Sequence, residues 1–153
     1  MSFRPAQSNS ETQRSSASAH QVSELLKHAG LRPTRQRLAL GELLFGTEDR
    51  HVTAEMLHEE VVSTQFSVSL ATVYNTLRQF TEAGLLRAIA VDGARTYFDT
   101  NTSAHHHFLN ERTGRLIDIP SDEMRIAGLP DAPEGMEIAS VDVIVRVRDR
   151  RKV

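Results

Sequence analysis

The stretch 69-SLATVYNTLRQFTEAGLLRAIAVDGARTYFD-99 decides the fold of this chain, because it joins a helix signal to a hairpin signal. Its first half predicts a helix that Ser69 caps and Gly84 ends. The inward apolar side chains of this helix recur at helical spacing: Leu70, Val73, Leu77 and Phe80. Its second half predicts two strands that turn at Asp92-Gly93, a dipeptide typical of tight hairpins.

Upstream of this stretch, the sequence predicts three further helices. The first begins at about Ser18, where the apolar positions start to share one face. The second has Thr34 as its N-cap, and the third, shorter helix has Thr53. Helices followed by a hairpin in this order are typical of a winged helix-turn-helix lobe, which we expect over residues 19–99.

Downstream, the sequence predicts a second and smaller lobe. The segment 101-NTSA-104 is a plausible hinge, and the turn 111-ERTG-114 separates two runs that read as a hairpin. We expect a short helix near Ser121 to Ala127, then a strand over 136-MEIASVDVIVRV-147, whose valines alternate with period two. A lobe of this size buries little surface alone, so a second subunit is expected to complete it.

Composition excludes several classes of protein. The chain has 153 residues, 39% of them hydrophobic, a net charge of −2 and no cysteine, so disulfides, cysteine zinc knuckles and thiolate-bound heme are excluded. It has neither a secretory signal nor a run of about 18 apolar residues, so we expect a cytoplasmic protein without membrane partners. No P-loop or dinucleotide-binding glycine pattern is present, so we expect no enzyme; hydrolysis by a histidine-bound zinc is the alternative.

The helix that follows Ser69 is the candidate for reading DNA in the major groove. Its N-terminal half presents small hydroxyls, a tyrosine and an asparagine, which suit phosphates and base edges. An arginine cluster in 30-GLRPTRQR-37 can grip the flanking phosphate backbone. The alternative is an ordinary solvated helix face. The candidate DNA-binding residues are Arg35, Ser69, Thr72, Tyr74, Asn75 and Arg78.

Three adjacent histidines, His105, His106 and His107, are the candidate ligand-binding residues. Side chains alternate along a strand, so His105 and His107 point to one face and His106 to the other. A His-x-His pair is a sound start to a metal site, because both imidazoles converge on one ion. A plain solvated run of histidines is the alternative.

Three segments resemble the ferric uptake regulator family of bacterial repressors: 30-GLRPTRQRLALGELL-44, 51-HVTAEMLHEEV-61 and, most specifically, 69-SLATVYNTLRQFTEAGLL-86. The resemblance runs from about Leu25 to Ile119. It implies a homodimer, or a higher oligomer, that binds an AT-rich inverted repeat of double-stranded DNA. We therefore expect an α+β fold with a disordered leader at 1–17, a winged helix-turn-helix DNA-binding domain at 18–99 and a small α/β dimerisation and ligand-sensing domain at 100–153.

The resemblance also implies a metal site. By position, His51, Asp99, His105 and His107 match the family's sensory site, which bridges its two lobes and binds Fe²⁺, Mn²⁺ or Zn²⁺. The chain departs from the family where relatives carry two Cys-x-x-Cys pairs, so their structural zinc is absent. It also departs at a second metal site, which His106 and Asp118 match by position. There Ala104 precedes the triplet and the tail has no histidine, so His106 lacks its usual partners.

The cysteine-free triplet is most similar to the iron response regulator (Irr) branch of that family. That similarity implies heme as the signal, with His105, His106 and His107 as the heme-binding residues. The chain would then regulate iron and heme metabolism genes, binding DNA at low iron and being released by heme. The alternative function is a conventional repressor of the same family that Fe²⁺, Mn²⁺ or Zn²⁺ activates.

Overall fold

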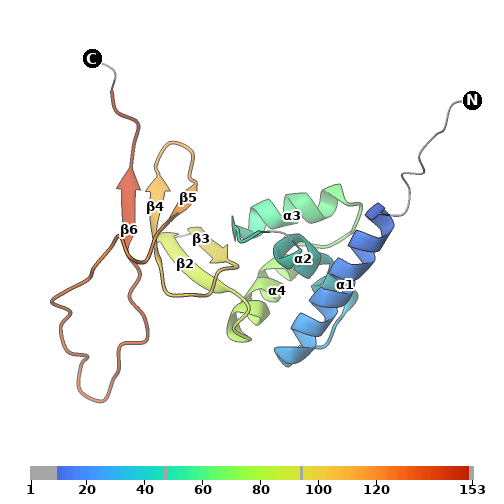
Figure 1. Cartoon of the computed structure of the whole chain (residues 1–153), viewed down its shortest axis with the longest axis horizontal. Helices are drawn as coiled ribbons and strands as arrows, with labels where there is room; N and C mark the ends of the chain where they lie inside the picture. Colours follow the sequence, from blue (N-terminus) through green and yellow to red (C-terminus); the bar gives the residue numbers. More distant parts are fainter. Residues whose placement is uncertain (1–9, 47, 94, 152–153) are drawn as a thin grey trace, which may run out of the picture. The chain divides into compact units, whose positions relative to one another are not determined.

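The computed structural model describes residues 10–46, 48–93 and 95–151. The chain divides into two compact units, one ending at Thr102 and the other starting at Ser103. This division falls inside the segment expected to be a hinge, three residues beyond the domain boundary that the sequence suggests. The fold is α+β, with helices confined to the N-terminal unit among the described residues (Figure 1).

The N-terminal unit combines helices with a small antiparallel sheet (Figure 1). Its described elements are α1 (Ser10–His28), α2 (Arg35–Phe45), β1 (His51–Val52), α3 (Ala54–Ser63), α4 (Leu70–Glu82), β2 (Arg87–Asp92) and β3 (Arg95–Asp99). The strands lie in the order β1-β3-β2. None of the helices formed by the described residues has the length and apolar character needed to cross a membrane.

The three predicted N-caps are confirmed. The side chain of Thr34 accepts a hydrogen bond from a backbone N–H in the first turn of α2, and Thr53 and Ser69 do the same for α3 and α4. Each cap satisfies a backbone N–H that has no partner inside its helix, which stabilises the helix by about 1 kcal/mol. Hydrogen bonds between residues close in sequence therefore determine where these helices begin.

The core of the N-terminal unit forms where the four helices meet the sheet. Fully buried aliphatic and aromatic side chains fill it: Leu26, Leu40, Leu44, Val52, Leu57, Val61, Val73, Leu77 and Phe80. Gly41 allows α1 to approach α2 closely, because a Cβ at this position would lie 2.6 Å from Cγ1 of Val22. Inward-facing positions of α4 belong to this core, so the opposite face of α4 remains outside it.

Two features of the N-terminal unit differ from the sequence prediction. The first helix, α1, begins at Ser10 and not at about Ser18 as expected. Residues 1–9 of the expected leader lie outside the described residues, so the disorder of the leader stays a prediction. The hairpin is confirmed, but Asp92 still pairs with Arg95, so the turn comes one residue later than expected.

The C-terminal unit is built on the three strands β4 (His106–Asn110), β5 (Leu116–Ile119) and β6 (Ile144–Val147). They lie in the order β5-β4-β6, with β4 antiparallel to β5 and parallel to β6. The hairpin predicted around 111–114 is therefore confirmed.

Two elements of the C-terminal unit differ from the sequence prediction. The helix expected near Ser121 to Ala127 is wrong, since this segment has a turn and bend followed by residues without regular secondary structure. So short a helix needs a packing partner to form. The strand expected over residues 136–147 is reduced to Ile144–Val147, because β4 offers β6 only the four paired positions His107–Asn110.

Candidate functional site

Two histidines and an aspartate converge on one face of the C-terminal sheet. His107 lies directly opposite Asp118 across the β4–β5 pair, and His105 lies two residues earlier on the same side. The Nε2 atoms of His105 and His107 are 3.2 Å and 3.3 Å from the same oxygen, Oδ1 of Asp118. Their rings have centroids 4.5 Å apart, so the three side chains form one compact group.

Backbone chemistry fixes which nitrogen of His105 faces this group. Its Nδ1 lies 2.7 Å from the carbonyl oxygen of Ser103. A carbonyl only accepts hydrogen bonds, so Nδ1 carries the hydrogen, and Nε2 holds the lone pair when the ring is neutral. A backbone carbonyl that orients a histidine in this way is the usual support of a metal-binding imidazole.

His106 is engaged elsewhere, as the alternation along a strand predicts. The backbone N–H of Val143 donates a hydrogen bond of 3.1 Å to its Nδ1. Val143 directly precedes β6, so His106 helps to hold β6 beside β4. The triplet therefore divides into a converging pair and one structural residue.

Asp118 is the residue of this group that the sequence prediction did not include among the ligands. The predicted hairpin contained the signal, because a turn at 111–114 that pairs Asn110 with Arg115 also pairs His107 with Asp118. Counting residue pairs along the hairpin from this turn identifies Asp118 as the residue opposite His107. The family resemblance had instead matched Asp118, together with His106, to a second metal site.

A second pair, His51 and Asp99, lies in the N-terminal unit. The two residues are register partners across β1 and β3, and Nε2 of His51 is 3.1 Å from Oδ2 of Asp99. The other carboxylate oxygen, Oδ1, accepts a hydrogen bond of 2.9 Å from the backbone N–H of Asn101. Arg50 anchors the start of this strand to α3 through a two-pronged ion pair with Glu60.

These two groups supply nitrogen and oxygen donors and no sulfur. Imidazole and carboxylate are the donors that Zn²⁺, Fe²⁺ and Mn²⁺ take in proteins. In the C-terminal group, an Nε2 lone pair and a carboxylate oxygen point toward each other, and a divalent cation relieves the repulsion between them. The residues of each unit therefore fit a metal ion on the chemistry of their donors.

The candidate DNA-binding residues all belong to α4 or to the helix ends near it. Tyr74, Asn75 and Arg78 are exposed on α4, and Arg35 is exposed at the start of α2. Ser69 and Thr72 are partly committed to capping, since the Ser69 side chain accepts from the Thr72 N–H and its Oγ is 2.9 Å from Oγ1 of Thr72.

The arginine cluster near α2 has two roles rather than one. Nε and Nη2 of Arg37 donate to Oε1 of Gln79 on α4, and its Nη1 donates to the carbonyl of Arg32. Arg37 therefore ties α2 to α4. Arg32 and Arg35 are exposed, which leaves their charges toward solvent.

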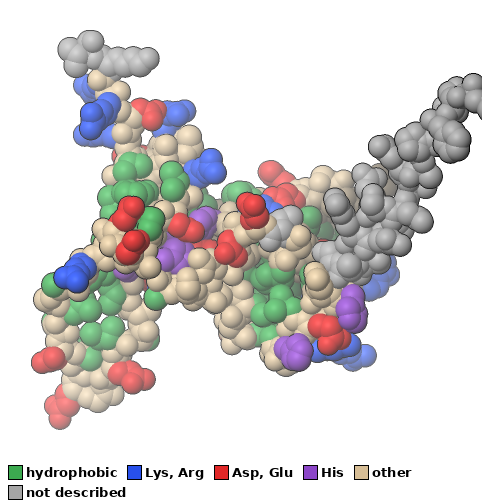
Figure 2. Space-filling model, in the orientation of Figure 1, with side chains coloured by type: hydrophobic (Ala, Val, Ile, Leu, Met, Phe, Trp, Pro, Cys, Tyr) green, Lys and Arg blue, Asp and Glu red, His purple; other side chains and the backbone are tan. Residues whose placement is uncertain are grey.

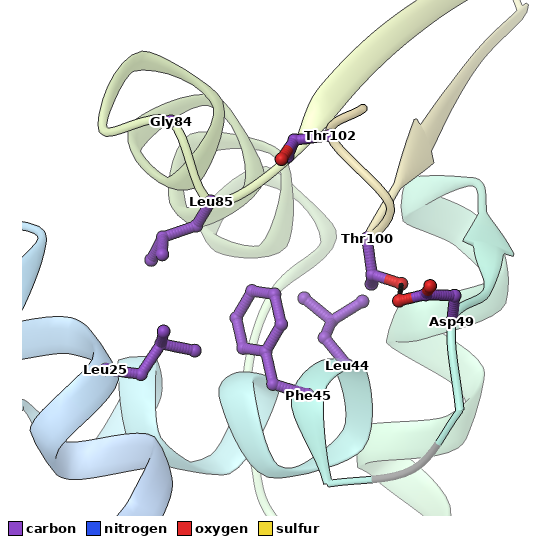
Figure 3. A pocket seen from close by; sticks show the side chains of 8 residues that line it. All are labelled: Leu25, Leu44, Phe45, Asp49, Gly84, Leu85, Thr100 and Thr102. Atoms are coloured by element: carbon purple, nitrogen blue, oxygen red, sulfur yellow. Dashed lines mark hydrogen bonds between the residues drawn. The ribbon is translucent and has the colours of Figure 1, made fainter. Parts of the chain in front are cut away.

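The N-terminal unit also has an open hollow of about 400 Å³ between α1, the end of α2 and the segment after α4. Figure 3 shows Leu25, Phe45 and Leu85 turned toward the same space. Its polar edge is formed by Thr100, whose hydroxyl donates to Asp49 at 3.3 Å. Asp49 is the titratable side chain among the residues that line this hollow.

Both units therefore carry donors of the kind that metal ions bind, and the N-terminal unit also exposes a polar face of α4. The chain belongs to the ferric uptake regulator family, whose family model matches residues 28–146. The members of this family are transcription regulators, so the prediction that the chain is not an enzyme is confirmed.

Individual relatives agree with this assignment. The ferric uptake regulation protein of Pseudomonas putida is 31% identical over 128 residues, which cover 82% of this chain and 96% of that protein. The peroxide operon regulator of Bacillus subtilis is 37% identical over 103 residues, covering 65% and 70%. The ferric uptake regulator of Pseudomonas aeruginosa, solved with manganese, has a TM-score of 0.64 at 28% identity, covering 84% and 98%. These similarities do not separate the branches of the family.

Proposed function

We propose that this chain is a DNA-binding transcription regulator whose affinity for its operator rises when it binds a divalent metal ion. The observation that carries the proposal is the convergence of His105, His107 and Asp118 on one sheet face, with a tautomer of His105 suited to metal binding. Such a regulator controls genes of iron or other metal homeostasis.

On the DNA side, we assign the N-terminal unit as a winged helix-turn-helix domain with α4 as recognition helix and the β2–β3 hairpin as wing. Supporting this, the inward face of α4 is fully committed to the core, while Tyr74, Asn75 and Arg78 are exposed. Exposed Arg35 is suited to the flanking phosphates. In a two-fold dimer, two such helices reach successive major grooves about 34 Å apart.

On the metal side, we infer that one ion takes ligands from both units: His51 and Asp99 from the first, and His105, His107 and Asp118 from the second. Each half is already assembled as a cross-strand pair within its own unit. An ion shared by both halves restrains the orientation of one unit relative to the other. If that orientation favours DNA binding, metal and DNA strengthen each other's affinity.

Heme as the signal has weaker support from the triplet. His106 accepts a hydrogen bond at Nδ1, which places the hydrogen of its neutral ring on Nε2. Ligation of heme iron through Nε2 would place the hydrogen on Nδ1 instead, so the bond from Val143 would be lost. His105 and His107 share a carboxylate, which suits a small ion better than a macrocycle. Heme is therefore one arm of the test below.

We further propose that the C-terminal unit forms a homodimer interface. Figure 2 shows hydrophobic side chains at the surface of this unit. Its exposed large apolar side chains include Ile117, Ile126, Leu129, Met136 and Ile138. A unit this small with so much apolar surface gains stability when a second copy covers it.

The test of this function starts with a randomised library of DNA duplexes, from which the wild-type protein selects its sequence in Mn²⁺. Binding to the selected duplex is then measured by fluorescence anisotropy in chelator, in Mn²⁺ and with stoichiometric heme, at one salt concentration. We expect Mn²⁺ to strengthen binding by about 5- to 150-fold, the usual range of such couplings. Binding that is insensitive to metal but lost on adding heme would replace metal by heme as the signal.

A further inference from the structure

A carboxylate lies against the tyrosine of the recognition helix. The hydroxyl of Tyr74 on α4 donates a hydrogen bond of 2.6 Å to Oε1 of Glu55, in the first turn of α3. Both residues are exposed, and within the described part of the chain this is the hydrogen bond that the Tyr74 hydroxyl makes. An anionic residue at a surface assigned to DNA needs an explanation, because it repels phosphate.

The surroundings give the tyrosine little other support. Its side chain is 41% exposed. Together with Glu55 it borders an open hollow of about 590 Å³, whose other wall includes Arg95 and Tyr97 of β3. A phenol beside such a hollow can take several rotamers, so the bond to Glu55 selects one of them.

The polarity of this bond is fixed. The hydrogen bond between Tyr74 and Glu55 lowers the pKa of the Glu55 carboxyl. The same bond raises the pKa of the Tyr74 phenol. The carboxylate accepts and cannot donate, so the hydrogen of the hydroxyl points to Glu55. What Tyr74 then offers to a partner is the lone pair of its oxygen.

From this geometry, we propose that Glu55 is a specificity-determining positioning residue for DNA, which rests on the function proposed above. It holds Tyr74 in one rotamer and presents the phenolic oxygen to the major groove as an acceptor only. An acceptor matches the exocyclic amino groups of adenine and cytosine and is repelled by phosphate oxygens and by the carbonyl oxygens of guanine and thymine. Glu55 therefore acts on base preference, through Tyr74, rather than on overall affinity.

The test repeats the selection from the randomised duplex library with Glu55→Ala, Tyr74→Phe and the double variant. We expect each single variant to lose about fivefold of discrimination at the same base position of each half-site. The double variant should lose no more than either single one, because both changes remove one interaction. Glu59→Ala is the matched control, since Glu59 is an exposed carboxylate one turn further along α3.

Other outcomes overturn the inference in distinguishable ways. If Glu55 only repels phosphate, Glu55→Ala will tighten binding to all duplexes equally, also in the Tyr74→Phe background. If its role is only to support α3, Glu55→Gln, which keeps an acceptor oxygen, will not restore the base preference. If the wild-type protein selects no sequence at all, the proposed function fails and this inference fails with it.

The pairing itself can be checked without DNA. The chain has two tyrosines, so in a Tyr97→Phe background the ultraviolet titration follows Tyr74 alone. We expect the phenol to ionise at a lower pH in the Glu55→Ala variant than in its parent. Unchanged titration would show that the hydrogen bond does not persist in solution and would overturn the inference.

Discussion

Replacing His107 with alanine is expected to weaken the binding of Zn²⁺ or Mn²⁺ by about 100-fold or more. His107 is buried, and its Nε2 faces Oδ1 of Asp118 at 3.3 Å. Residues that merely support metal ligands are worth about 10- to 100-fold in affinity, so a ligand itself is worth at least as much. Isothermal titration calorimetry of the purified variant with each metal measures this loss.

Two further variants make this experiment specific. His28→Ala removes an exposed histidine at the end of α1 and should leave metal affinity unchanged. His106→Ala removes the neighbour whose Nδ1 accepts from Val143, so it should lower the stability of the β4–β6 pairing by about 1 kcal/mol without comparable loss of metal. Equal loss of metal from His106→Ala and His107→Ala would contradict the division of the triplet.

Replacing Phe80 with alanine is expected to lower the free energy of unfolding of the N-terminal unit by about 3–5 kcal/mol. Phe80 is fully buried on α4, and its ring lies 5.7 Å from that of Phe45 on α2, centroid to centroid. Removal of the ring leaves a cavity that the surrounding helices can only partly close. Since small domains are stable by about 5–15 kcal/mol, this loss is a large share of the total.

Urea unfolding followed by circular dichroism measures the effect of this change. Phe80→Leu is the matched control, because it keeps most of the apolar volume and should cost about 1.5 kcal/mol or less. A Phe80→Ala variant that unfolds within 1 kcal/mol of the wild type would show that α4 is held by something other than its buried stripe.

The helices and the first hairpin could be predicted because their signals are local. Thr34, Thr53 and Ser69 act within one turn of their own helix, and the buried stripe of α4 is a periodicity within 13 residues. Those predictions needed no knowledge of tertiary partners. The two incorrect predictions in the C-terminal unit concern elements that depend on tertiary partners.

The strand expected from Met136 shows why. Alternation along 136–147 is compatible with a strand, but a strand forms only where a neighbour supplies hydrogen bonds, and β4 supplies them only to Ile144–Val147. The helix expected near Ser121 is too short to be stable from its local sequence alone, and this segment has no helix in the structure.

Some candidate metal ligands could likewise be predicted from local patterns, and others could not. His105 and His107 follow from the two-residue period of a strand, and Asp118 could have followed from the register of the hairpin. The pairing of His51 with Asp99 joins residues far apart in sequence through a strand of two residues. No local sequence pattern predicts so short a strand. Only the family resemblance indicated that His51 and Asp99 belong to one site.

The measurement that most directly tests the central claim is the affinity of the protein for Mn²⁺, determined with and without a saturating amount of the selected duplex. Coupling between two binding sites is reciprocal, so DNA must strengthen Mn²⁺ binding by the same factor by which Mn²⁺ strengthens DNA binding. We predict tighter Mn²⁺ binding in the presence of the duplex, and loss of this difference in the His51→Ala variant. An Mn²⁺ affinity that is identical with and without DNA would contradict a metal-dependent regulator.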